Sequence, residues 1–221
     1  DADDEHAGYD QNYNGSGQAL AVIDSGVKDH PDLKPDIKVS FLDKTEDKYG
    51  HGNHVSGIIA GDGDHSDGPY RGIAPDVFLV NLRVLDDLGQ GFTSDVIAAL
   101  DWVLQYGHSM DIHIVNMSLG KGVETEVAFD PLVQAVEQVW DAGIVVVASA
   151  GNAGPDPMTI GVPGNVPYVI TVGAMSDNYT PEDMADDVLA SFSAAGPTVE
   201  GFVKPEVVAP GGHVVGLMAA N

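Results

Sequence analysis

Three polar residues lie beside apolar stretches and carry side chains that suit nucleophilic hydrolysis. Asp24 ends the apolar run 19–23, His51 follows an acidic loop, and Asn152 comes shortly after the apolar run 144–147. An aspartate can fix the tautomer of an imidazole, a histidine can take a proton from a nucleophile, and an asparagine amide can donate hydrogen bonds to an oxyanion. Because ligands bind at strand ends in open α/β sheets, these positions predict an active site, although spacing alone does not show that the side chains meet.

Each of the three residues also has a simpler interpretation. Asp24 is typical of a turn after a strand, and Asn152 lies in a run of small residues that is typical of a Gly/Asn turn. His51 and His54 are three residues apart, so they could be a hydrogen-bonded pair at a helix start. Together with Asp24 they could instead be the ligands of a metal-dependent hydrolase. The sequence contains no His-Glu-x-x-His zinc-peptidase motif, and this alternative leaves Asn152 unexplained.

Short apolar runs typical of β-strands alternate with segments of helical periodicity. The expected strands are residues 19–23, 37–41, 77–84, 112–119, 144–147, 168–172 and 205–210. This alternation predicts an α/β fold in three layers, in which a mostly parallel β-sheet has helices on both faces. No repeat or linker divides the sequence, so one domain over residues 1–221 is expected.

Three helices are expected between the strands. A Gly-rich helix begins at His51, a second is capped by Thr93 or Ser94, and a third has Asp130 as its cap and Pro131 at its first position. The expected buried stripes are Val96, Leu100, Val103 and Leu104 in the second helix and Leu132, Val136, Val139 and Trp140 in the third.

The composition excludes several classes of function. The 34 acidic residues outnumber the 9 basic ones and give a net charge of −25, which argues against nucleic acid and anionic membranes as partners. The sequence has no cysteine, which excludes disulfides, cysteine nucleophiles and thiolate metal sites. No apolar run approaches the length that spans a bilayer. The acidity suits a solvated surface, a high-salt habitat or calcium binding.

Five short segments, taken in order, resemble motifs of the subtilisin-like serine proteases (subtilases). They are AVIDSGV at 21–27, HGNHVSG at 51–57, NMSLG at 116–120, SAGNAG at 149–154 and GVPGNVPYVITVGA at 161–174. The resemblance implies a subtilisin-like fold and a secreted, extracellular serine endopeptidase that works through an acyl-enzyme and needs no organic cofactor. By the same resemblance, Asp24 orients the base, His51 is the general base, and Asn152 donates to the oxyanion.

The resemblance also implies which residues bind the substrate. Two backbone segments would flank an extended peptide and bond to it as added β-strands. Glycine at 161 leaves the floor of the primary specificity pocket open, which implies a large apolar or aromatic residue before the scissile bond. The residues concerned are Gly89, Gln90 and Gly91 on one side of the peptide, Ser118, Leu119 and Gly120 on the other, and Ala150, Gly151 and Gly161 in the pocket.

The sequence departs from the family pattern in two ways. The histidine motif has Asn53 and Ser56 where Thr and Ala are commonest, and no Gly-Thr-Ser nucleophile motif follows the segment 209–211. The expectation is therefore a catalytic domain incomplete at its C-terminal end and completed by a second polypeptide that carries the serine. The alternative is a subtilase-fold fragment or pseudoenzyme that binds a peptide or partner without cleaving it. A prodomain that assists folding is a further possible partner.

The resemblance suggests two cation sites, one at Asp32 and one formed by the backbone carbonyls of Gly164, Val166 and Val169. Calcium prefers six or more oxygen ligands, and carboxylates of the loop 62–67 could supply some of them. A solvated acidic loop is the alternative for that segment.

Overall fold

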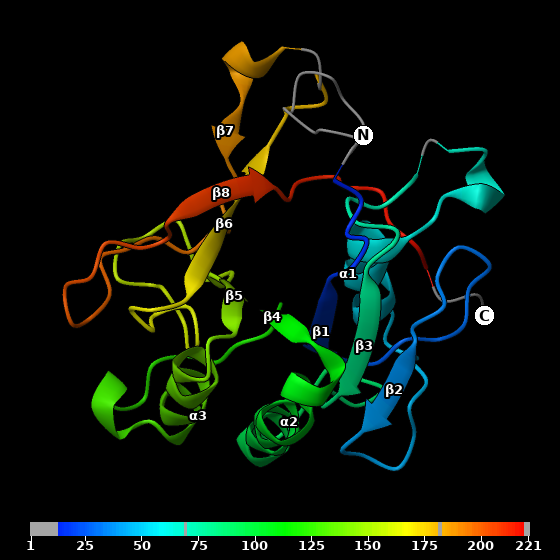
Figure 1. Ribbon diagram of the computed structural model, residues 1–221. Helices are drawn as coiled ribbons and strands as arrows, with labels where there is room; N and C mark the ends of the chain where they lie inside the picture. The colour runs from blue at the N-terminus through cyan, green and yellow to red at the C-terminus, as the bar shows by residue number, and fades with distance from the viewer. Residues whose placement is uncertain (1–12, 69, 181–182, 219–221) are drawn as a thin grey trace. The chain divides into compact units, whose positions relative to one another are not determined.

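The computed structural model describes residues 13–68, 70–180 and 183–218. The chain divides into two compact units. The first contains the residues up to Val115 and those from Val215 onward, and the second runs from Asn116 to Val214. Figure 1 labels the elements of both units. The single domain expected from the sequence stays a prediction.

The first unit is built on three parallel strands. They are β1 (Ala19–Asp24), β2 (Ile37–Ser40) and β3 (Phe78–Arg83). β3 lies between the other two strands, and its register places Asp24 of β1 beside Arg83. The apolar residues of β1 are almost fully buried, as the continuous apolar run in the sequence predicts. The strand therefore delivers Asp24 to its carboxyl end from within the core.

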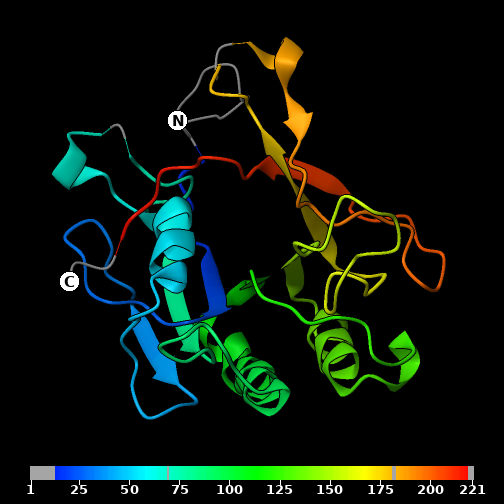
Figure 2. The same ribbon diagram turned by 180° about the vertical axis from the view of Figure 1, so that it is seen from behind.

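Two helices accompany these strands. Helix α1 (His51–Ala60) lies against β1, as Figure 2 shows, and α2 (Thr93–Tyr106) follows β3. The expected cap of α2 was wrong, because the helix begins at Thr93 and Phe92 is its N-cap, without a side-chain capping bond. The stripe of α2 is buried at Val96, Ala99, Leu100 and Val103, whereas Leu104 is only half-buried.

A short segment near the end of the described chain joins the core of the first unit. Leu217 packs in a buried cluster with Val22, Val27 and Leu79. It passes so close to α1 that a Cβ at Gly57 would lie 2.7 Å from the Leu217 Cγ atom. This close packing requires glycine at 57. Glycine lowers the intrinsic helix propensity of α1, and the packing of Leu217 against the helix compensates for it.

The second unit is built around β6 (Ile170–Ser176). It pairs in parallel with β5 (Val145–Ser149) and with β8 (Val207–Pro210). A two-residue strand, β7 (Val188–Leu189), pairs with it antiparallel and was not expected. Strand β4 (Ile112–Met117) crosses the boundary between the units.

Helix α3 (Pro131–Asp141) precedes β5 and begins as expected. The backbone N–H of Leu132 donates to the Asp130 carboxylate at 2.8 Å. The expected burial of Trp140 was wrong, because this side chain is 42% exposed and stacks on Tyr168 with the ring centroids 4.6 Å apart. Two half-exposed rings shield each other there, so the tryptophan does not need the core.

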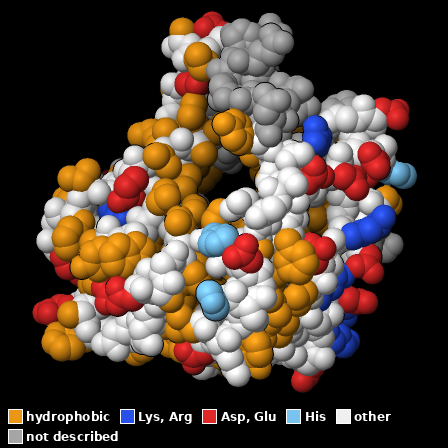
Figure 3. Space-filling view, viewed as in Figure 1, with side chains coloured by type: hydrophobic (Ala, Val, Ile, Leu, Met, Phe, Trp, Pro, Cys, Tyr) orange, Lys and Arg blue, Asp and Glu red, His pale blue; other side chains and the backbone are white. Residues whose placement is uncertain are grey.

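The surface agrees with the acidic composition. On the face seen in Figure 3, acidic side chains are scattered widely and basic ones are fewer. Within the described residues, no helix is both long enough and apolar enough to cross a membrane.

Candidate active site

Asp24 and His51 form a close side-chain pair in the first unit. The His51 Nδ1 atom lies 2.8 Å from one oxygen of the Asp24 carboxylate and 2.9 Å from the other. The Asp24 side chain is fully buried, whereas the His51 side chain is 41% exposed. An ionised carboxylate can only accept, so Nδ1 carries the proton and Nε2 is left as the acceptor. This arrangement suits an imidazole that takes a proton from a group outside it.

A close backbone approach places the two residues together. A Cβ at Gly52, the second residue of α1, would lie 2.1 Å from the carbonyl oxygen of Gly26, which follows β1. The Gly52 N–H donates to the Ser25 hydroxyl at 2.8 Å, and the Ser25 N–H donates to Asp24 at 2.6 Å. The exit of β1 and the start of α1 are therefore in direct contact, which sets the distance between the carboxylate and the imidazole.

Asp47 is a functional candidate that the sequence analysis missed. Its carboxylate is fully buried and accepts the N–H of Gly50 at 2.8 Å and the N–H of Asn53 at 2.9 Å. These two donors lie on either side of His51, so the carboxylate holds the first turn of α1. The signal in the sequence is an aspartate three residues before the Gly-His at which the helix begins.

The surroundings raise the pKa of His51 above its ordinary value of 6.5. The hydrogen bond to Asp24 is the largest cause, and the charges of Asp24 and Asp47 act in the same direction. Partial burial of the ring opposes them by disfavouring the imidazolium. Two carboxylates thus stabilise the protonated form of this histidine.

The two departures in the histidine motif have different surroundings. The Asn53 amide donates to the Lys28 carbonyl at 3.0 Å and accepts from the Lys28 N–H at 2.6 Å. Asn53 therefore ties the first turn of α1 to the segment that follows β1. The Ser56 hydroxyl is buried and has no hydrogen-bond partner among the described residues.

His54 does not join this pair. A Cβ at Gly216 would lie 2.6 Å from the His54 Cδ2 atom, so the ring packs against the backbone of that segment. No cluster of three or more His, Asp or Glu side chains suited to a metal ion occurs in the part of the chain that the structure describes. A metal-dependent hydrolase built on Asp24, His51 and His54 therefore gains no support from the geometry.

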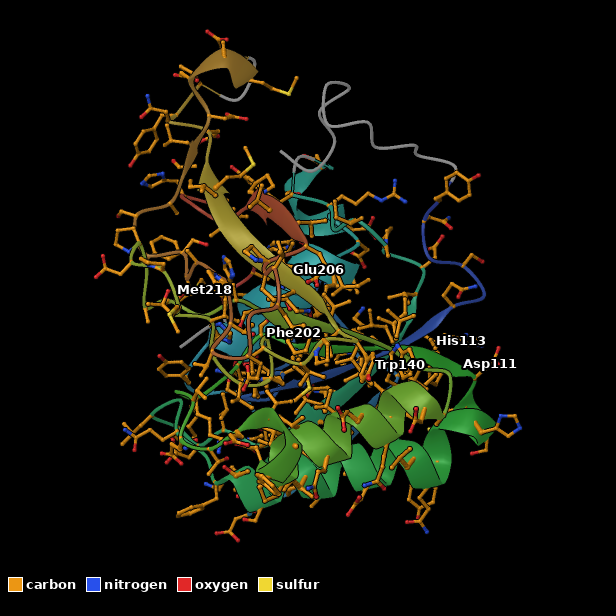
Figure 4. All side chains as sticks on the ribbon, turned by 90° about the vertical axis from the view of Figure 1, so that its left-hand side faces the viewer. Asp111, His113, Trp140, Phe202, Glu206 and Met218 are labelled. Atoms are coloured by element: carbon orange, nitrogen blue, oxygen red, sulfur yellow. The ribbon has the colours of Figure 1, made fainter. Side chains whose placement is uncertain are left out.

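A second His-Asp pair in the chain offers a contrast. Figure 4 labels Asp111 and His113, whose Oδ1 and Nε2 atoms lie 3.3 Å apart. Their side chains are 77% and 52% exposed. Water competes for such a pair, whereas the buried Asp24 has no such competition, so only the Asp24–His51 pair has a fixed orientation.

The predicted substrate segment 89–91 forms an exposed turn in the first unit. The Gly89 N–H donates to the Asp86 carbonyl at 3.1 Å, and Gln90 and Gly91 are exposed. Tyr49 lies over this turn, because a Cβ at Gly89 would be 2.5 Å from its ring. The same ring lies 6.5 Å from the ring of His51, between centroids. The Tyr49 ring therefore lies beside the imidazole of His51.

Asn152 lies at a cavity in the second unit. The cavity has a volume of about 260 Å³ and is formed by the ends of β5 and β8, by β6 and by the residues after β4. It brings together several of the predicted site residues of this unit. Its lining includes Asn152, Ala150, Gly151 and Ser118.

The two segments of the predicted specificity pocket lie against each other, and a Cβ at Gly161 would be 2.8 Å from the Lys121 carbonyl oxygen. The Gly161 N–H donates to the Ala150 carbonyl at 3.1 Å, which holds the two pocket segments together. The nearest atoms to a Cβ at Gly151 would be the Ala194 Cβ at 3.7 Å and the Gly161 nitrogen at 3.8 Å. Nearby, a Cβ at Gly120 would be 2.8 Å from the Val162 carbonyl oxygen, so Leu119 and Gly120 run close to this loop.

The predicted cation ligands already contact protein donors. One oxygen of the buried Asp32 carboxylate accepts the N–H of His65 at 2.7 Å. The Gly164 carbonyl accepts from the Thr171 hydroxyl, and the Val169 carbonyl accepts from the Lys204 ammonium. Calcium at Asp32 stays a prediction.

Known proteins match almost the whole chain. The model of the subtilase family matches residues 15–221. The chain is 44% identical over 225 residues to the serine protease AprX of Bacillus subtilis (strain 168), with 96% of this chain and 50% of AprX covered. It is 36% identical over 217 residues to subtilisin DY of Bacillus licheniformis, with 96% of this chain and 70% of that protein covered.

Solved structures agree with these matches. Sphericase superposes with a TM-score of 0.80 at 30% identity, covering 94% of this chain and 70% of its own. A cold-adapted subtilisin-like serine proteinase superposes with a TM-score of 0.72 at 31% identity, covering 96% of this chain and 69% of its own. The chain thus spans half the length of AprX, and the expected three-layer α/β fold with a mostly parallel sheet is confirmed. The chain belongs to the subtilase family of subtilisin-like serine proteases.

Proposed function

We propose that this protein is a serine endopeptidase that hydrolyses peptide bonds through an acyl-enzyme. The observation that carries the proposal is the Asp24–His51 pair, in which a buried carboxylate holds Nδ1 and leaves Nε2 facing outward as a base. Membership of the subtilase family supports the same chemistry.

Each residue has a defined part in the proposed reaction. The Nε2 atom of His51 takes the hydroxyl proton of a serine as its oxygen attacks the peptide carbonyl carbon. Asp24 stabilises the imidazolium that forms, and the amide of Asn152 donates to the oxyanion. When the tetrahedral intermediate collapses, the imidazolium returns the proton to the leaving amine, and water then hydrolyses the ester by the same route.

The nucleophilic serine is proposed to lie outside these 221 residues. The support is the sequence, which contains Ala209-Pro-Gly211 but no Gly-Thr-Ser. The cavity at Asn152 adds to it, because a small-residue hollow at the ends of β5, β6 and β8 leaves room for another segment.

The proposed substrate is an extended peptide with a large apolar side chain before the scissile bond. Its backbone would bond to residues 89–91 and 118–120. The exposure of Gln90 and Gly91 supports this assignment. The protein is proposed to act outside the cell, and a prodomain is a proposed folding partner.

The test is an intact-mass spectrum, under denaturing conditions, of the whole protein after treatment with a fluorophosphonate. We expect a labelled serine that lies outside residues 1–221. No label at all would overturn the protease in favour of a peptide-binding module.

Two histidine variants provide the controls for this test. His51→Ala removes the proposed base and should slow labelling by several orders of magnitude. His113→Ala changes an exposed histidine that also lies beside an aspartate, so it should leave the labelling rate unchanged.

A further inference from the structure

Lys204 is a buried lysine in the second unit, and its side chain is only 1% exposed. An ammonium ion is strongly hydrated in water, so burial is costly unless protein oxygens replace the water. The Lys204 Nζ atom donates to the Val169 carbonyl at 2.9 Å and lies 2.6 Å from the Glu206 Oε1 atom. A carbonyl and a carboxylate thus surround the charge.

Glu206 is itself fixed in place. Its second oxygen accepts the N–H of Thr171 in β6 at 2.8 Å. Glu206 directly precedes β8, and Figure 4 labels it beside these strands. Burial raises the pKa of the Glu206 carboxyl, but the bonds to Lys204 and to the Thr171 backbone outweigh that effect and lower it overall. The carboxylate is therefore held ionised against the ammonium.

The loop 161–169 has its carbonyls directed to protein donors. The Gly164 carbonyl accepts from the Thr171 hydroxyl at 2.6 Å, and the Val166 carbonyl accepts from the Val169 N–H at 3.4 Å. The third carbonyl, that of Val169, accepts from Lys204. The ammonium occupies the position at the Val169 carbonyl that a bound metal ion would need, and the other two carbonyls each accept a protein hydrogen bond, so the loop does not fit a metal ion while Lys204 is present.

We propose that the Lys204 ammonium is the built-in cation of the loop 161–169 and that its removal would open a site for a monovalent cation. Replacing the lysine by an apolar residue would leave one Glu206 oxygen and the Val169 carbonyl without the donor that they share, while the other Glu206 oxygen keeps the Thr171 N–H. One carboxylate and one neutral carbonyl, with water as the remaining ligands, match a single positive charge, which favours K⁺ or Na⁺ over a divalent ion.

The consequence concerns the loop that carries Gly161. This loop is tied to the neighbouring segment by the bond from the Gly161 N–H to the Ala150 carbonyl. With an internal ammonium, its order does not depend on the ions in solution. This inference concerns stability, so it holds whether or not the proposed protease activity does.

The test compares melting temperatures in KCl, NaCl and tetramethylammonium chloride at equal ionic strength. Lys204→Met should melt about 5–10 °C lower than the wild type in tetramethylammonium chloride, because the buried ammonium is lost from the Val169 carbonyl and the Glu206 carboxylate. It should recover along a saturable curve in KCl or NaCl. Lys204→Met/Glu206→Gln should not recover, because the carboxylate that would bind the ion is gone.

Lys121→Met is the matched control. Lys121 also pairs with a carboxylate, that of the buried Asp130, at 2.9 Å. This variant should lose stability equally in all three salts. A Lys204→Met protein without K⁺- or Na⁺-specific recovery would overturn the proposal.

If Lys204→Met does not fold, the proposal is tested by comparing how the melting temperatures of the wild type and of Glu206→Gln respond to added ions. The proposal expects both to respond alike to K⁺, Na⁺ and Ca²⁺, because no ion binds at this loop in either. A saturable stabilisation of the wild type that Glu206→Gln abolishes would overturn it.

Discussion

Both oxygens of the Asp24 carboxylate lie within hydrogen-bonding distance of one atom, Nδ1 of His51, at 2.8 and 2.9 Å. This forked contact fixes the plane of the imidazole as well as its tautomer. The carboxylate is in turn held by the Ser25 N–H, so the imidazole is oriented from the backbone of β1.

Asp24→Asn should lower the pKa of His51, because the variant removes the negative charge that stabilises the imidazolium and leaves at most a weaker hydrogen bond from a neutral amide oxygen. NMR titration of the imidazole protons measures this directly. If the protease proposal holds, the acid limb of the rate profile should move to lower pH while kcat falls. Asp111→Asn, at the exposed pair, is the control and should leave the His51 titration unchanged.

The same pKa shift predicts a pH dependence of stability. A raised pKa in the folded state stabilises the fold below the ordinary value of 6.5, and this contribution is lost as the pH rises through the folded-state pKa. The difference in unfolding free energy between wild type and Asp24→Asn should therefore be larger at pH 6 than at pH 9. Urea melts at both values measure it, and an equal difference would contradict the raised pKa.

Asp47→Asn should also lower the pKa of His51, but by less than Asp24→Asn, because Asp47 acts through its charge alone. An asparagine oxygen can still accept one of the two N–H groups at the start of α1. Asp130→Asn is the control, since Asp130 caps α3 in the same way. It should lower the melting temperature without moving the His51 titration, and an unmoved titration in Asp47→Asn would reduce Asp47 to a helix cap.

Asn152→Ala should lower kcat in the complete protease and leave KM nearly unchanged, because an oxyanion donor acts mainly in the transition state. The expected loss of about 10²–10³-fold is the magnitude measured for an oxyanion asparagine in a subtilisin, a member of the same family. Steady-state kinetics on a peptide substrate measure it. A rise in KM with constant kcat would instead assign Asn152 to ground-state binding.

Added salt should raise the melting temperature. With a net charge of −25, the folded state carries strong self-repulsion, which salt screens over about 10 Å at 0.1 M. Thermal melts from 0.05 to 2 M tetramethylammonium chloride measure the effect without a specific alkali ion. A flat response would mean that the acidic residues are spaced widely enough not to interact.

The sequence was most informative where one local cause dominates. The apolar run before Asp24 predicts a buried strand with a carboxylate at its end, and Asp130-Pro131 predicts a capped helix start. Both features depend on neighbours in the chain. The cap of α2 was harder to predict. Thr93 and Ser94 have side chains that suit an N-cap, but the helix already begins at Thr93, so both residues lie inside it.

Features that depend on distant contacts were not predictable. The position of Asp47 before the Gly-His pair indicates a helix start, but it does not show that the carboxylate would be buried beside His51, because that contact requires the loop 45–47 to fold against Gly26 and Arg83. The Lys204 ammonium meets a carbonyl 35 residues away. Trp140 fits the helical stripe, but its stacking on Tyr168 depends on where the later loop 161–169 places that tyrosine.

The absence of a side chain at Gly52 has a practical consequence for protein engineering. Any heavier residue there would collide with the Gly26 carbonyl and drive the helix away from the strand. Libraries that vary the surroundings of the imidazole should therefore hold positions 26 and 52 constant, together with the buried Asn53, and seek diversity at the exposed Tyr49. The close contact of these two glycines sets the distance between the Asp24 carboxylate and the His51 imidazole.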